Sequence, residues 1–150
     1  MGKPGRIVWN QRNGAAANAH RQLPRLVGDY FAVVRQALAT DPPPDKLHPI
    51  RLASKKLRYT LELFRECYGP GLETRLKALQ QLQQALGEVN DCTAALRLIQ
   101  KISPESPTRR RSEEFLRRRA ARKAAELRKE WHEVFDAPGR EKWWTAYLGK

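Results

Sequence analysis

Four ionisable side chains recur along one segment of the chain at the spacing of a helix face. They are His48, Arg51, Lys55 and Arg58, at successive intervals of three, four and three residues. At 100° per residue, these intervals place all four side chains on one side of an α-helix. Like charges at such spacings destabilise an isolated helix by about 0.2–0.5 kcal/mol per pair. The helix would be stabilised by an extended polyanion lying along this side, so the pattern predicts anion binding.

These side chains offer different contacts to an anion. An arginine guanidinium donates two parallel hydrogen bonds to phosphate oxygens, whereas a lysine ammonium is a compact point charge. Lys56 adds a second ammonium beside Lys55. A neutral histidine also donates a hydrogen bond, and it gains charge near pH 6.5. The alternative interpretation is an ordinary solvated helix face, on which Glu62 would pair with Arg58.

The helix that carries these cations is expected over residues 47–68. Its other side repeats apolar residues at helical spacing, namely Ile50, Ala53, Leu57, Leu61, Phe64 and Tyr68. The preceding connector, residues 40–45, contains three consecutive prolines that cannot continue a helix. Asp45 is the expected N-cap, and Pro49 is tolerated in the first turn. The sequence Tyr-Gly-Pro-Gly over residues 68–71 is expected to end the helix.

Three more long helices and one short helix are expected. Apolar residues recur at intervals of three and four over residues 16–39, 72–102 and 109–135, and a short closing helix is expected over 140–150. Pro24 is expected to stand in the first regular turn of the first helix. Residues 1–15 show no periodicity and are expected to form a flexible arm. The predicted fold is all-α: one domain over residues 16–150, a four-helix bundle unit of long antiparallel helices.

Residues 86–91 interrupt the expected third helix with poor helix formers. Gly87, Asn90 and Asp91 each have low intrinsic helix propensity. A local cost in mid-helix indicates a tertiary or functional use. We expect Gly87 to allow close approach of another helix and Asp91 to hold a guanidinium from a neighbouring helix. Asn90 and Asp91 are therefore assigned structural, orienting roles.

The charge balance of the chain favours anionic partners. Its 150 residues include 29 Lys and Arg against 16 Asp and Glu, which gives a formal net charge of +13. Such a charge favours nucleic acid, polyphosphate or a membrane surface as a partner. No apolar run is long enough to span a membrane and no signal-peptide pattern is present. We therefore expect a cytoplasmic protein without a membrane span.

Motifs for catalysis or metal binding are missing from the sequence. It contains no glycine-rich phosphate loop, no zinc-ligand spacing and no nucleophile–base motif. Cys67 and Cys92 lie among apolar residues, as buried free thiols do. No catalytic residue, metal or cofactor is therefore expected.

Two segments, HPIRLASKKLRYTLELF and LQQLQQALGEVNDCTAAL, resemble the CHAD domain (conserved histidine α-helical domain). The family pattern places basic residues three, seven, eight and ten positions after a histidine, as Arg51, Lys55, Lys56 and Arg58 follow His48. The family's next helix carries Leu-Gly-x-x-Asn/Arg-Asp, which Leu86, Gly87, Asn90 and Asp91 match. The two motifs occur in the family's order, and the resemblance extends over residues 20–148.

The resemblance implies a helical protein that binds inorganic polyphosphate in a basic groove and performs no catalysis. The implied site contains His48, Arg51, Lys55, Lys56 and Arg58, with Lys77 added from the third helix and Arg119, Arg122 and Lys123 from the fourth. Free phosphate or sulfate would mimic the ligand. Association with polyphosphate granules in the cytoplasm is the implied location.

The sequence departs from the family in carrying one histidine-led helix where most members carry two. The chain is therefore a single-unit member or a half that needs a partner, and a homodimer with two His48 helices face to face would restore the usual arrangement. Two other functions stay open. A nucleic-acid-binding protein fits the charge, although no recognition helix or aromatic platform is visible. A phosphate-processing enzyme would need carboxylates for Mg²⁺, for which Asp91 is thin support.

Overall fold

The computed structural model describes residues 7–150 and contains only helices, turns and loops within them. The α-helices are α1 (Ala15–Ala39), α2 (His48–Leu63), α3 (Gly71–Ile102), α4 (Pro107–Glu130) and α5 (Arg140–Leu148). Short 3₁₀ turns η1 (Pro44–Lys46) and η2 (Arg65–Cys67) flank α2, and a π-helical turn η3 (Trp131–Phe135) follows α4. The predicted all-α class is confirmed. None of these described helices is long and apolar enough to cross a membrane.

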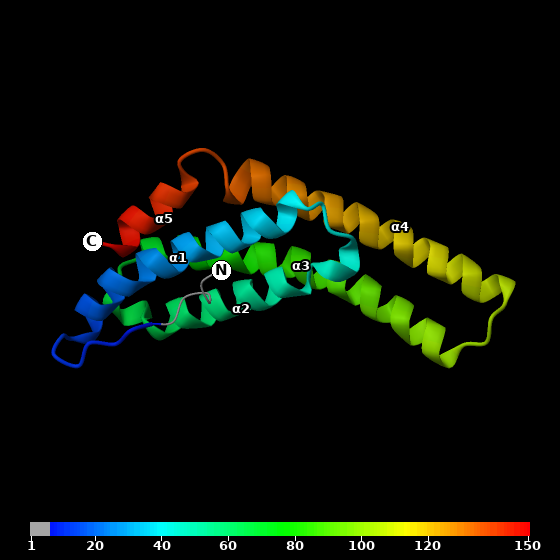
Figure 1. The fold of residues 1–150 in the computed structure, drawn as a ribbon, viewed down its shortest axis with the longest axis horizontal. Coiled ribbons are helices and arrows are strands. Elements are labelled where there is room, and N and C mark those ends of the chain that lie inside the picture. Colours follow the sequence, from blue (N-terminus) through cyan, green and yellow to red (C-terminus); the bar gives the residue numbers. More distant parts are fainter. Residues whose placement is uncertain (1–6) are drawn as a thin grey trace.

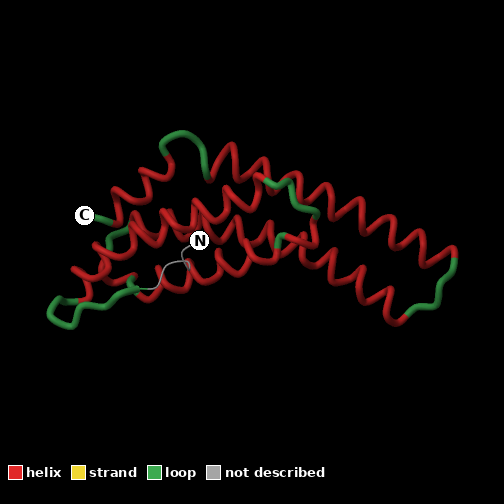
Figure 2. The backbone as a smooth tube through the Cα atoms, in the orientation of Figure 1, coloured by secondary structure: helices red, strands yellow, loops and turns green. Residues whose placement is uncertain are grey.

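The helices divide into a bundle and a projecting hairpin. Helices α1, α2, α5 and the first half of α3 lie together, whereas the second half of α3 and α4 extend beyond them (Figure 1). The α3–α4 loop stands at the far end of this hairpin, and α4 runs back to the bundle (Figure 2). Helix α1 packs against α2 and α5, α2 against α3, and α3 against α4. The second half of α3 therefore lies outside the bundle. The four long helices do not run side by side along their whole length.

Aromatic side chains from both ends of the chain form the centre of the core. Phe31 on α1 lies 5.5 Å from Trp131 and 5.4 Å from Phe135, ring centroid to ring centroid, and Trp144 of α5 lies 5.5 Å from Phe135. All four rings are buried. Tyr30 joins them and places its hydroxyl 2.6 Å from Ser54 Oγ on α2. Burial raises the pKa of this tyrosine above its ordinary value.

Helix α1 begins earlier than the sequence predicted, at Ala15, so Pro24 stands inside it. The buried side chain of Asn18 explains this start. Its Oδ1 accepts a hydrogen bond from the Asn10 amide at 2.8 Å, and its Nδ2 donates to the carbonyls of Asn10, Asn13 and Gly14. These bonds hold the preceding turn against the first turn of the helix. Residues 7–14, expected to be flexible, are thus attached to the body, and residues 1–6 lie outside the described part.

Both ends of α2 differ from the prediction. Asp45 is not the N-cap: it lies in η1, and Leu47 occupies the cap position without a side-chain cap bond, followed by Pro49 in the first turn. The helix ends at Leu63 and gives way to η2, five residues before the predicted end at Tyr68. The Gly-Pro-Gly segment instead begins α3, because Pro70 and Gly71 stand at its N-terminus.

A buried arginine attaches α5 to the start of α3. The Arg75 guanidinium carbon lies 3.6 Å from the ring centre of Trp143 and 3.9 Å from that of Tyr147. Its two terminal nitrogens donate to the carbonyls of Gly71 at 2.9 Å and Trp143 at 2.7 Å. Burial lowers the pKa of Arg75. A Cβ at Gly71 would lie 2.6 Å from the Tyr147 ring, so this contact requires glycine.

Candidate functional site

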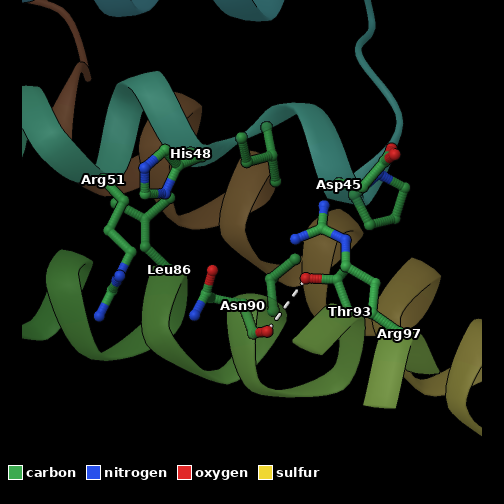
Figure 3. A pocket seen from close by; sticks show the side chains of 10 residues that line it. Asp45, His48, Arg51, Leu86, Asn90, Thr93 and Arg97 are labelled. Carbon is green, nitrogen blue, oxygen red and sulfur yellow. Dashed lines mark hydrogen bonds between the residues drawn. The ribbon is translucent and has the colours of Figure 1, made fainter. Parts of the chain in front are cut away.

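A cleft opens where the start of α2 and the η1 connector face the middle of α3. Its volume is about 340 Å³. We call it the basic cleft, and define it by its lining residues: Pro44, Asp45, Leu47, His48, Arg51, Leu86, Val89, Asn90, Thr93 and Arg97. The apolar members lie on both walls, while the polar side chains of α2 and α3 converge across the opening (Figure 3).

Nitrogen donors reach the basic cleft from both walls. His48 and Arg51 come from α2, and the Arg51 side chain extends toward α3, whereas Arg97 extends from α3 toward the connector (Figure 3). His48 and Arg97 are exposed and Arg51 is half-buried. Among residues 7–150, none of the three forms an ion pair within 4 Å. Their hydrogen-bond donors are therefore free to meet an anion.

Arg97 was not among the predicted site residues. It follows Asn90 by seven residues, two helical turns, so both side chains lie on the same side of α3. The seven-residue spacing in the sequence could have indicated that Arg97 shares a side of α3 with Asn90. It identifies Arg97 as a site residue only when α2 is known to pack over this part of α3. The Asn90 amide faces the cleft and Thr93 Oγ1 donates to the Asn90 carbonyl at 3.0 Å.

The connector before α2 is held in place by α4. Arg128 donates a hydrogen bond to the carbonyl of Pro42, and its Nε lies 3.3 Å from Asp41 Oδ1. Asp41 adopts a left-handed backbone conformation with φ of 47°, which aspartate and asparagine adopt more readily than most other residues with a side chain. Because η1 and Leu47 follow directly, this contact fixes where α2 begins and hence where His48 stands.

The basic cleft continues toward α4. A second cavity of about 340 Å³ shares Pro44, Asp45, Thr93 and Arg97 with the first and reaches Arg117 on α4. Arg97 therefore stands between two cavities that form one path. Arg117 differs from the other cations, since its guanidinium donates to Glu113 at 3.2 Å. Hydrogen bonding by Arg109 lowers the pKa of Glu113, with a smaller contribution from Arg117.

The remaining predicted cations of α2 lie on two different sides. Lys55 is exposed on the His48 side and its ammonium stands 5.8 Å from the Tyr59 ring centre. Arg58 is half-buried, 3.8 Å from Glu62, and its Nε has no hydrogen-bond partner among the described atoms. From His48 to Arg58 these side chains extend the surface by about 15 Å along the helix. Lys56 instead lines a small pocket between α1 and α2.

The predicted cations of α3 and α4 do not gather at the basic cleft. Lys77 is exposed about 20 Å along α3 from Asn90, and helical spacing puts it on the other side of that helix. Arg119 is two residues past Arg117, a rotation of 200°, so it points away from the cleft. Arg122 is likewise exposed and lines neither cavity of the cleft. Lys123 is paired with Glu88 at 3.2 Å.

The expected orienting roles of residues 86–91 are not seen. Asp91 is exposed and joins no ion pair among the described residues, because its position on α3 points away from the basic cleft and its arginines. A Cβ at Gly87 would meet nothing within 4 Å, so close helix approach does not explain this glycine. Asn90 lines the cleft directly. Across residues 7–150, no group of three or more His, Cys, Asp or Glu could hold a metal ion.

Comparison with known proteins identifies the family. The family model for the CHAD domain matches residues 6–100, which contain α1, α2, most of α3 and every residue of the basic cleft. No curated protein and no solved structure gives a significant match. The matched segment is more than half of the chain and carries both motifs that resembled the family. The chain therefore belongs to the CHAD domain family.

Proposed function

We propose that this protein binds inorganic polyphosphate without turning it over, and that the basic cleft is the central part of the binding surface. CHAD domains in general bind polyphosphate. The observation that supports the proposal most directly is the convergence of His48, Arg51 and Arg97 from two helices on one cleft, with no ion-pair partner among the described residues. An anion in the cleft would satisfy donors on both walls together.

The shape of the surface favours a chain-like anion over a compact one. The basic cleft joins the cavity that reaches Arg117, and Lys55 and Arg58 continue the charge along α2. A flexible polyanion would contact such a path at several points, with arginines as bidentate donors and Asn90 as a neutral donor. Binding should release counterions and weaken steeply as salt rises, as it does for nucleic acids.

Binding without turnover is proposed because the carboxylates of this region are few. Asp45 is the only acidic residue that lines the basic cleft. Mg²⁺ in phosphate-processing enzymes is usually held by one or two carboxylates together with substrate phosphates. The enzyme alternative therefore depends on Asp45. Asp91, the carboxylate considered from the sequence, does not line the cleft. A location in the cytoplasm, at polyphosphate granules, and the use of phosphate or sulfate as mimics remain part of the proposal.

A competition experiment separates polyphosphate binding from nucleic-acid binding. Labelled long-chain polyphosphate is bound to the protein at fixed salt, and duplex DNA or RNA is added at equal phosphate concentration. We expect polyphosphate to remain bound, and displacement by either nucleic acid would favour the nucleic-acid alternative. Incubation of pure protein with polyphosphate and Mg²⁺ should release no orthophosphate. Release that is abolished by Asp45→Asn would establish an enzyme instead.

A further inference from the structure

The projecting hairpin has an apolar outer face that no residue among 7–150 covers. On α3, Leu98 is 55% exposed and Ile102 is 67% exposed, and on α4 Phe115 is 60% exposed. Between them, a shallow cavity is lined by Ala95, Ile99, Arg111, Ser112, Phe115 and Leu116. Exposed apolar surface that is contiguous, rather than scattered, marks an interaction site. We call this surface, together with Asp91, Arg119 and Arg122, the outer face.

The outer face is separate from the basic cleft. Arg97 and Arg117 line the path of the cleft, and the outer-face residues Ala95 and Phe115 each stand two positions before them. Two residues correspond to 200° around a helix, so the two surfaces lie on opposite sides of the hairpin. A partner on the outer face would leave the basic cleft open.

Charged residues continue the outer face toward the bundle, and their signs differ between the two helices. On α3, Asp91 precedes Ala95 and Leu98 on the same helical stripe, and on α4, Arg119 and Arg122 follow Phe115. Asp91, Arg119 and Arg122 are exposed and form no ion pair within residues 7–150.

The level of these charges along the hairpin is fixed by the Lys123–Glu88 pair, whose Nζ and Oε2 lie 3.2 Å apart. Asp91 lies about one helical turn from Glu88 in the direction of the hairpin tip. Arg119 lies about one turn from Lys123 in the same direction. The acid and the base therefore stand at the same level on neighbouring helices. A surface with an acidic position on one helix and a basic position on the other is complementary to itself after a two-fold rotation.

We propose that the outer face binds a second copy of this chain through a two-fold axis parallel to the hairpin. This rotation lays α3 of each protomer antiparallel along α4 of its partner. Leu98 and Phe115 then meet at the centre, and Asp91 of each protomer meets Arg119 of the other. The four helices form a bundle in which both apolar stripes are buried. The two His48 helices do not face each other in this dimer, and each basic cleft remains open.

The first test measures molar mass by light scattering and sedimentation velocity from micromolar to hundred-micromolar protein. The wild type should dimerise, and Phe115→Glu should raise the dimer dissociation constant at least tenfold. Leu63→Glu is the matched control, because Leu63 is 82% exposed on α2, outside the outer face, and it should leave the dimer intact. A wild type that stays monomeric throughout, or a dimer that Phe115→Glu does not dissociate, would overturn the proposal. Circular dichroism verifies that the variants are folded.

Charge reversal tests the orientation of the two protomers. Asp91→Arg and Arg119→Asp should each weaken self-association, because like charges then meet twice across the two-fold axis. An equimolar mixture of the two variants should form a heterodimer, since every contact again joins opposite charges. Failure of the mixture to pair would overturn the α3–α4 arrangement. Polyphosphate binding by the monomeric Phe115→Glu variant is measured separately, so this proposal and the polyphosphate proposal can fail independently.

Discussion

Removal of the two arginines that line opposite walls of the basic cleft should weaken polyphosphate binding more than the loss of charge alone explains. The variant is Arg51→Gln with Arg97→Gln. Both guanidinium groups are partly exposed, so each contact to phosphate is worth about 1 kcal/mol, below the 1.5–3 kcal/mol of buried charge-assisted bonds. A combined loss of about 2 kcal/mol corresponds to roughly a 30-fold higher Kd.

The salt dependence of polyphosphate affinity gives a second, independent test of the same double variant. Each lost phosphate contact lowers the slope of log K against log salt by about 0.7, by analogy with single-stranded nucleic acid. The double variant should therefore show a slope that is smaller by about 1.4. Isothermal titration calorimetry or fluorescence anisotropy with labelled polyphosphate, repeated at several salt concentrations, measures both quantities.

A matched control separates the cleft from net charge. Arg12→Gln with Arg25→Gln removes the same two charges, and both arginines are exposed, outside the basic cleft and free of ion pairs within the described residues. Residues 7–14 pack near the other end of α2, where Trp9 stacks on Phe64. We expect this control to raise Kd threefold at most, on the scale of a surface charge effect of about 0.5 kcal/mol. Equal losses in the two double variants would refute a binding site at the cleft.

Three further predictions concern single side chains. Asp45→Asn removes the carboxylate from the cleft, and because this reduces repulsion by about 0.5–1 kcal/mol it should lower the polyphosphate Kd two- to fivefold in the same titration. Arg75→Leu removes two hydrogen bonds and two aromatic contacts, so chemical denaturation should show a loss of about 2–4 kcal/mol. The lowered pKa of Glu113 stabilises the fold above the ordinary glutamate pKa of about 4.3. This stabilisation should be lost as pH falls through the lowered value, and hydrogen exchange at the hairpin tip should then rise.

Each of these three predictions has a control. Glu66 is exposed on η2, away from the cleft, and Glu66→Gln should leave polyphosphate affinity nearly unchanged; an equal gain would assign the effect to net charge. Arg75→Lys keeps the charge but loses the planar stacking, so full stability in this variant would contradict the proposed contact. Glu113→Gln should remove the acid-dependent change in hydrogen exchange, and persistence of that change would exclude Glu113 as its source.

The helices and connectors that the sequence predicted correctly are those set by local chemistry. Helix α3 was predicted to within one residue, because its apolar repeat begins at Leu72 and the connector follows Ile102. The start of α1 was not, since the local preference against Pro24 is outweighed by the bonds of Asn18 to residues 10–14 and by the burial of Leu23. Hydrogen bonds between a helix and the turn that precedes it leave no periodic signal in the sequence.

The sequence predicted the site residues that lie on a single helix. It did not predict which residues of a second helix would join them. His48 and Arg51 share a face of α2, so their spacing alone brought them together. Arg97 joins them only because α2 packs over the middle of α3. Lys56 illustrates the opposite error, because one residue past Lys55 rotates the side chain by 100° toward α1. Motif spacing identifies which residues share a family pattern, whereas packing decides which of them meet.

The closing contacts between α1 and the chain after α4 also bear on how this protein folds. Arg35 donates to Asp136, 101 positions further along the chain, at 2.8 Å, and Trp144 is fully buried in the core. Closing so long a loop costs entropy before burial repays it, which slows folding relative to helical proteins with local contacts. The segment that the family model matches, residues 6–100, lacks this closure. The core of that segment is therefore completed by Trp131, Phe135 and Trp144, which lie beyond it in the sequence.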